Sequence, residues 1–74
     1  MAREIAIRGQ TIRLGQLLKL AGVADSGSDA KMLLADGAVS VNGEPETRRG
    51  RQLHAGDRVL AGDEELHVTG EHES

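Results

Sequence analysis

The first part of the chain changes from an alternating pattern of polar and apolar residues to a helical one. Residues 4–8, Glu-Ile-Ala-Ile-Arg, alternate and end at Gly9, which predicts a short, half-buried strand. From Leu14 onward, apolar residues follow at i+3, i+4 and i+7, with Thr11 as a candidate cap before them and Gly22 after them. This spacing predicts a helix of about two or three turns.

The same helical spacing returns after a loop over residues 23–27. Ser26 and Asp29 form a capping pattern ahead of it. The apolar stripe consists of Ala30, Leu33, Leu34 and Gly37, of which the glycine is the expected helix stop. A second short helix therefore follows the first, with Lys31 on one side of the stripe and Asp29 and Asp36 on the other.

The rest of the chain alternates again and contains several turn signals. Residues 39–43 end in Asn42-Gly43, a strong hairpin signal, so a strand is expected to turn back there. Gly50 lies in the middle of the returning segment, residues 44–53, and indicates a bulge or an excursion from regular pairing.

A last hairpin is predicted from residues 58–61 and 65–69, with Leu66 and Val68 facing inward. A strand, two helices and then several strands favour an α+β fold, in which two adjacent short helices pack on a small twisted, mainly antiparallel sheet. We expect a single domain over residues 1–70 and a polar tail over residues 71–74.

Composition narrows the functional classes. A chain of 74 residues can bury only about 60% of its unfolded surface, so its core is expected to be small. It has no cysteine, no apolar run long enough to span a membrane and no hydrophobic signal-peptide core at its start. We therefore expect a cytoplasmic protein and a monomer.

The chain also has no Phe, Tyr or Trp, which removes base stacking on aromatic rings as a way of binding RNA. Its formal net charge is −3, but the acids are concentrated at the end. Residues 63–74 contain five acids and no Lys or Arg, whereas residues 1–62 contain nine bases and seven acids, a sum of +2. Affinity for phosphates depends on local basic clusters, so the overall charge does not exclude a nucleic-acid partner.

One basic cluster stands out, because Arg48, Arg49 and Arg51 fall within four positions. Guanidinium groups bind phosphate oxygens through paired hydrogen bonds, so the cluster is a candidate phosphate-binding segment. The alternative is a solvated turn in which the arginines pair with Glu44 and Glu46. If the segment alternates as a strand, Arg48 and Arg49 face opposite sides, and only two of the three arginines reach one RNA strand.

Other chemistries find little support in the sequence. The three histidines match no common metal-ligand spacing, and no serine has a histidine placed to activate it as a nucleophile. The glycines form no phosphate-binding loop. We therefore expect no catalytic residue, no metal site, no cofactor and no small-molecule substrate.

The segment RLGQLLKLAGVADSGSDAKMLLADGAVSVNG, residues 13–43, resembles the RNA-binding domain family named after ribosomal small-subunit protein S-four, also called the alpha-L motif. The shared features are the Arg-Leu pair at 13 and 14, the Leu pair at 17 and 18, and the run from Gly37 to Gly43. The downstream segment RRGRQLHAGD is similar to that of small stand-alone bacterial members. The resemblance spans about residues 12–60.

The resemblance implies two helices against a short sheet, and binding of structured RNA, often ribosomal RNA or tRNA, along the helix pair and the adjoining loop. Carried over residue by residue, it implies the RNA-binding residues Arg13, Lys19, Ser28, Lys31, Arg48, Arg49 and Arg51. Two positions depart from the family pattern. Gly15 stands where Asp is common, and Asp29 stands where Arg is common, which shifts the weight to Lys31 and the arginines.

Our hypothesis from the sequence is therefore non-catalytic binding of structured RNA through a basic edge of the helix pair and the arginine-rich segment. The acidic end, residues 63–73, is expected to lie away from the RNA. The alternative is a protein-interaction module that docks on a ribosome-associated or RNA-processing partner.

Overall fold

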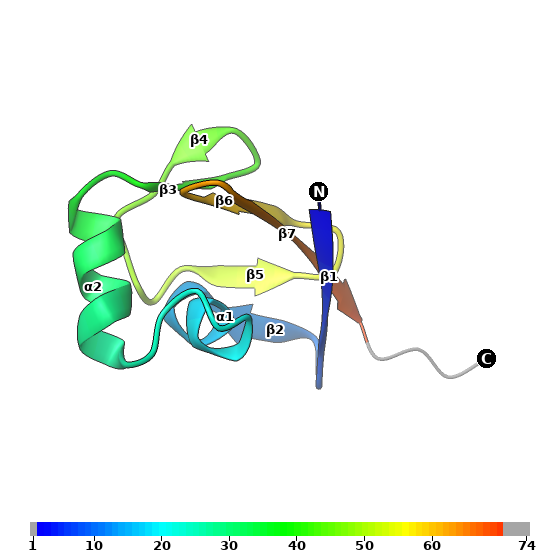
Figure 1. Cartoon of the computed structure of the whole chain (residues 1–74). Coiled ribbons are helices and arrows are strands. Elements are labelled where there is room, and N and C mark those ends of the chain that lie inside the picture. The colour runs from blue at the N-terminus through cyan, green and yellow to red at the C-terminus, as the bar shows by residue number, and fades with distance from the viewer. Residues whose placement is uncertain (1, 71–74) are drawn as a thin grey trace.

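A computed structural model describes residues 2–70, in which two helices combine with two sheets. Figure 1 shows how these elements are arranged. The elements, in chain order, are β1 (Ala2–Ile7), β2 (Thr11–Arg13), α1 (Leu14–Leu20), α2 (Gly27–Ala35), β3 (Val39–Val41), β4 (Glu44–Pro45), β5 (Gln52–His54), β6 (Arg58–Ala61) and β7 (Glu64–Gly70). The predicted tail, residues 71–74, lies outside the described residues. Neither helix in the described range is long and apolar enough to cross a membrane.

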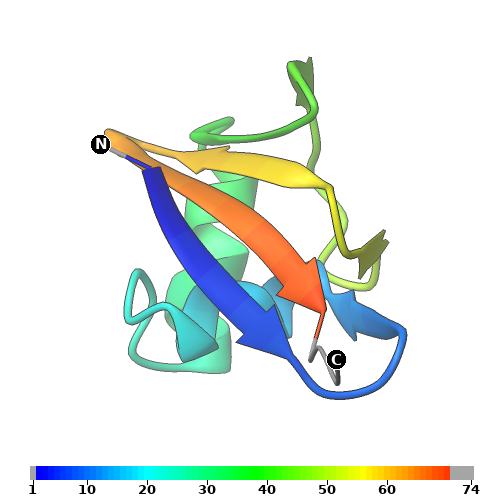
Figure 2. The ribbon, with the colours of Figure 1, turned by 90° about the vertical axis from the view of Figure 1, so that its right-hand side faces the viewer.

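The main sheet has five strands in the order β1-β7-β6-β3-β4. Only the β1–β7 pair is parallel, while β7–β6, β6–β3 and β3–β4 are antiparallel. Figure 2 shows that this sheet is twisted and that the two helices lie on one side of it. The structure thus confirms the predicted α+β class and the mainly antiparallel pairing.

The second sheet, a pair formed by β2 and β5, was not predicted. Thr11 belongs to this pair, opposite His54, so its prediction as the cap of the first helix is wrong. The N-cap of α1 is instead Arg13, whose side chain makes no capping hydrogen bond. The first backbone N–H groups of α1 donate instead to backbone carbonyls from a distant part of the chain.

The second helix begins and ends where its sequence signals predict. The Ser26 hydroxyl accepts a hydrogen bond from the backbone N–H of Asp29 at 3.2 Å, which satisfies one of the free donors of the first turn. Past the last turn, Gly37 has a φ of +74°, a left-handed conformation that glycine adopts without strain. Ala30 and Leu34 on the predicted stripe are buried against the rest of the core.

The core lies between the helices and the inner face of the main sheet. Leu66 and Val68 of β7 are fully buried, which confirms the predicted inward face of the last strand. The hairpin between β3 and β4 also forms as predicted, with positive φ at both Asn42 and Gly43, as a two-residue turn of this kind requires. With no aromatic residue, the core consists of Leu, Val, Ile and Ala side chains.

Candidate nucleic-acid interface

The segment that carries the arginines, residues 46–51, leaves the main sheet after β4 and crosses the start of α1. We call it the arginine loop. The backbone N–H of Leu14 donates to the carbonyl of Arg51 at 2.9 Å, and the N–H of Gly15 donates to the carbonyl of Arg49 at 3.0 Å. The first N–H groups of a helix have no partner within the helix, so the loop supplies the cap that α1 lacks in its own sequence. The same two bonds fix the position of the arginines relative to α1.

Gly15 makes this close approach possible. A Cβ atom built at this position would lie 3.5 Å from Cβ of Arg49 and 3.6 Å from its carbonyl oxygen. A methyl group fits at that distance, whereas a longer side chain would meet the Arg49 side chain. The glycine that departs from the family pattern is therefore the residue against which Arg49 packs.

Glu46 organises the other two arginines. It is the only charged side chain that is buried among the described residues, with a relative exposure of 6%. One carboxylate oxygen accepts from the backbone N–H groups of Thr47 and Arg48, at 3.0 and 3.1 Å, and from Arg48 Nε at 3.4 Å. The other accepts from Arg51 Nη1 at 3.0 Å. The hydrogen bond from Arg51, followed by that from the Arg48 backbone, lowers the pKa of Glu46 to about 2, so the carboxylate is charged at neutral pH.

The alternative reading of the cluster, as a set of ion pairs, therefore holds for two of the three arginines. Arg48 and Arg51 pair with Glu46, and no described arginine pairs with Glu44. The condition for strand alternation is not met, because residues 46–51 belong to no strand, and this confirms the excursion from regular pairing that Gly50 indicates. The Arg48 side chain nevertheless remains 78% exposed, whereas that of Arg51 is 34% exposed.

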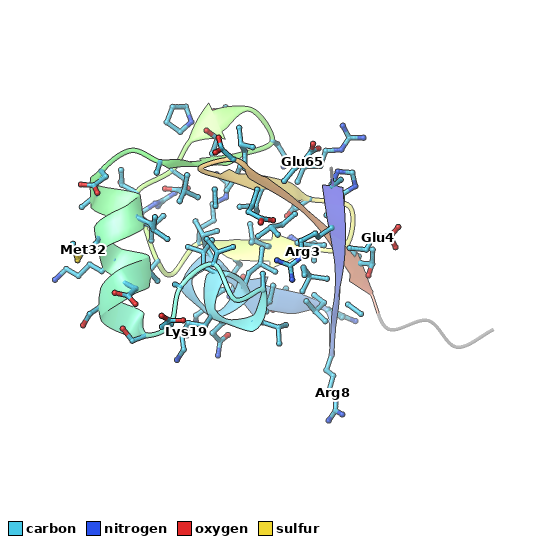
Figure 3. All side chains as sticks on the ribbon, in the orientation of Figure 1. Arg3, Glu4, Arg8, Lys19, Met32 and Glu65 are labelled. Atoms are coloured by element: carbon cyan, nitrogen blue, oxygen red, sulfur yellow. The ribbon has the colours of Figure 1, made fainter. Side chains whose placement is uncertain are left out.

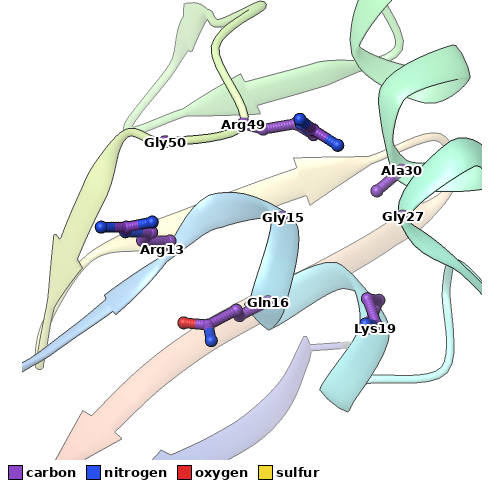
Figure 4. Close-up of a pocket in the computed structure, with 8 residues that line it drawn as sticks. All are labelled: Arg13, Gly15, Gln16, Lys19, Gly27, Ala30, Arg49 and Gly50. Atoms are coloured by element: carbon purple, nitrogen blue, oxygen red, sulfur yellow. The ribbon is translucent and has the colours of Figure 1, made fainter.

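Arg49 is placed differently from its neighbours. Within residues 2–70 no carboxylate lies at ion-pair distance from it, and its side chain extends from the loop toward the start of α2, as Figure 4 shows. A Cβ built at Gly27, the first residue of α2, would lie 3.8 Å from Arg49 Nη1. The guanidinium group thus lies between the two helices.

Arg49 shares a hollow of about 260 Å³ with Arg13 and Lys19 (Figure 4). We call it the basic hollow. Arg13 comes from the end of β2 and Lys19 from the last turn of α1, so the fold brings together three cations from three separate segments. The other lining residues are glycines, Gln16 and Ala30, and the lining contains no carboxylate. Positive charge is therefore concentrated at this place without an internal counter-charge.

The predicted site residues fall into three groups in the structure. Arg13, Lys19 and Arg49 line the basic hollow. Arg48 and Arg51 line a different hollow together with Gly50 and Gln52. Ser28 and Lys31 are exposed on α2 and line neither of these hollows.

Sequence reasoning missed Gln16 and Gly27 as lining residues. A signal existed for Gln16, which lies three residues after Arg13 and three before Lys19, the spacing of one helix face. None existed for Gly27, because its place in the hollow results from the packing of α2 beside the arginine loop.

The fold and this arrangement of loop and helices define a known class of domain. The chain belongs to the S4 domain family, whose model matches residues 5–69, and this confirms the resemblance inferred from residues 13–43. The matched range includes both helices and all of the arginine loop.

Two relatives have informative names. Over 59 residues the chain is 52% identical to "Probable ribosome maturation protein RlbA" of Bacillus subtilis (strain 168), a match that covers 80% of this chain and 83% of the relative. Over 48 residues it is 44% identical to "Putative RNA-binding protein YbcJ" of Escherichia coli (strain K12), covering 65% of this chain and 69% of the relative. Neither name denotes an enzyme.

Proposed function

We propose that this domain binds structured RNA, ribosomal RNA or tRNA, without catalysing a reaction and without a cofactor. The observation that carries the proposal is that Arg13, Lys19 and Arg49 line one hollow whose lining has no carboxylate. The family and the names of the two relatives support an RNA partner, and the name of the Bacillus subtilis relative favours ribosomal RNA.

In the proposed mechanism, the RNA backbone is bound mainly through its phosphates. Arg13 and Arg49 each offer a planar group that donates two parallel hydrogen bonds to phosphate oxygens, and Lys19 adds a compact charge. Neutralising these phosphates releases condensed counterions, which drives association and makes it depend on salt. Sequence specificity is low, because contacts to phosphates carry no information about the bases.

The remaining predicted residues have secondary roles in this proposal. Lys31 and Ser28 extend the edge along α2, and the exposed end of Arg48 adds charge beside the hollow. Arg51 acts through Glu46, with which it pairs, and so holds the arginine loop in the conformation that presents Arg49. A preformed loop loses less conformational entropy on binding than a mobile one.

The test is a salt titration of binding to fluorescently labelled fragments of ribosomal RNA. Arg13→Gln is compared with Arg58→Gln, since both arginines are exposed but Arg58 lies on β6 and does not line the basic hollow. We expect Arg13→Gln to weaken binding and to reduce the slope of log affinity against log salt by about 0.7–0.9, and Arg58→Gln to change the slope far less.

Two results would contradict the proposal. One is equal behaviour of the two variants, which would place the RNA elsewhere. The other is absence of salt-dependent binding to any fragment, together with capture of a ribosomal protein that depends on Arg13, which would identify a protein-interaction module instead.

A further inference from the structure

A second hollow lies next to the basic hollow, between the end of β1 and α1. Its volume is about 630 Å³, and its lining includes Arg8, Ile12, Gln16, Lys19 and Leu20. Gln16 and Lys19 also line the basic hollow, so the two hollows adjoin along one side of α1. A bound polymer that runs along the basic hollow past Lys19 therefore enters the second hollow.

The second hollow is also free of carboxylates. Its charged lining residues are Arg8 and Lys19, and no described acid lies at ion-pair distance from either. Figure 3 shows both side chains at the lower edge of the molecule, with Arg8 extending from the end of β1, whereas Glu65 lies at the opposite edge. Together the two hollows contain four cations, Arg8, Arg13, Lys19 and Arg49.

Unlike the basic hollow, the second hollow has an apolar part. Leu20 is 59% exposed although it is a large aliphatic residue, and the lining also includes Ile7 and the half-buried Ile12. A phosphate gains nothing from an aliphatic surface, but the face of a nucleobase does. Bases inside an A-form helix are stacked and cannot reach such a surface, whereas bases of unpaired nucleotides can.

We propose that the second hollow receives an unpaired nucleotide that adjoins the structured RNA, with its base on Leu20 and Ile12 and neighbouring backbone phosphates at Arg8 and at Lys19. This inference rests on the proposed function, because it extends the same RNA path. The ligand is thus a junction between a helix and a single strand, not a uniform duplex. In a chain without aromatic rings, the base contact is aliphatic and tolerant of base identity.

An acidic, leucine-containing peptide has similar chemistry, but the shared lining favours RNA. A peptide partner gives no reason for the apolar hollow to adjoin two further cations, Arg13 and Arg49, across Lys19, whereas a continuous polyanion makes use of all four. The test below makes the peptide one of its outcomes.

The experiment compares a blunt synthetic RNA hairpin, about one helical turn long, with the same hairpin carrying a single-stranded extension. The extension is tested at the 3′ end and at the 5′ end, and the more tightly bound of these two forms is used. We expect the wild-type protein to bind this extended hairpin about threefold to tenfold more tightly than the blunt one. Arg8→Gln and Leu20→Ser should each remove most of that gain and leave the affinity for the blunt hairpin unchanged.

The chain offers matched controls for both substitutions. Arg58 is an exposed arginine and Leu60 a leucine that is 48% exposed, and both lie on β6, away from the second hollow. Arg58→Gln and Leu60→Ser should keep the gain from the extension. All four side chains are exposed, so the variants should fold, which far-UV circular dichroism verifies.

The possible outcomes separate this inference from the proposed function. If Arg49→Gln weakens both hairpins while Arg8→Gln and Leu20→Ser keep the full gain, the nucleotide site is refuted and RNA binding stands. If the wild-type protein binds neither hairpin, both ideas are refuted. If the extension gives no gain but an acidic, leucine-containing peptide binds in a manner that depends on Arg8, the second hollow belongs to a protein partner and the inference is overturned.

Discussion

Arg48 and Arg49 are adjacent in the sequence, and the structure predicts that removing them has different effects on RNA binding. Arg49 lines the basic hollow and has no carboxylate partner in the described part of the chain. Arg48 lies outside this hollow, and its Nε is 3.4 Å from the buried carboxylate of Glu46. A direct phosphate contact by Arg48 has to compete with that ion pair, so Arg49→Gln should be the more damaging substitution.

The expected magnitude follows from the number of cations in the basic hollow. Each phosphate neutralised contributes about 0.7–0.9 to the slope of log affinity against log salt, so for RNA that occupies the basic hollow alone, Arg13, Lys19 and Arg49 together give a slope of about −2.4. Between 50 and 200 mM salt, the wild-type affinity should therefore fall by about thirtyfold. With Arg49→Gln the slope becomes about −1.6 and the fall about tenfold, whereas Arg48→Gln should remain close to the wild type.

Fluorescence anisotropy measures these slopes directly. The chain has no Trp or Tyr, so the label is placed on a ribosomal RNA fragment, and affinities are determined at four or more salt concentrations in this range. The reasoning is refuted if Arg48→Gln lowers the slope as much as Arg49→Gln does. It is also refuted if Arg49→Gln weakens binding by the same factor at every salt concentration, because loss of a phosphate contact must change the slope.

Three further predictions concern the parts that support the site. The pKa of Glu46 is lowered from 4.5 to about 2, so its ion pairs stabilise the folded state above pH 4.5 and are lost as the pH falls toward 2. Glu46→Gln should therefore make acid unfolding, measured by far-UV circular dichroism, less dependent on pH between 4.5 and 2, and an unchanged profile would contradict this role. Gly15→Asp should place a carboxylate beside Arg49 and reduce the salt slope by about one phosphate contact, whereas Gly15→Ala, which fits sterically, should not. Ser26→Ala removes the hydroxyl that accepts from the N–H of Asp29 and should lower the free energy of unfolding in urea by about 1 kcal/mol, while a loss near zero would mean that solvent satisfies this donor equally well.

Local signals explain which elements the sequence could predict. The cap at Ser26 and the stop at Gly37 lie within a few residues of the helix that they delimit, and the Asn42-Gly43 turn needs no information from elsewhere in the chain. The inward face of β7 follows from alternation alone. These features depend on neighbours in the sequence, and for that reason they were predicted correctly.

The second sheet and the arginine loop depend on distant partners. Thr11 pairs with His54, and Leu14 donates to Arg51, across separations that no local pattern reveals. Alternation also failed to place the arginines, because β4 ends at Pro45 and residues 46–51 belong to no strand. Gly50 was the available signal that this segment leaves regular pairing. Which arginines pair with Glu46 depends on the loop conformation, and so the basic hollow could not be derived from the spacing of charges.

The fold also explains how a chain with a net charge of −3 can present a site for a polyanion. Because β1 and β7 are parallel, Ala2 lies beside Glu65 and Ile7 lies beside Gly70, five residues further along both strands. The β6–β7 turn, with its acids, is therefore about 17 Å from the end of β1, where Arg8 follows. At physiological salt the Debye length is about 8 Å, so these acids are largely screened from that end, and Glu64 is in addition within 3.7 Å of Arg3. The part of the acidic end that the structure describes, up to Gly70, thus carries its charge away from the two hollows, and the binding that we propose depends on their local charge rather than on the sum over the chain.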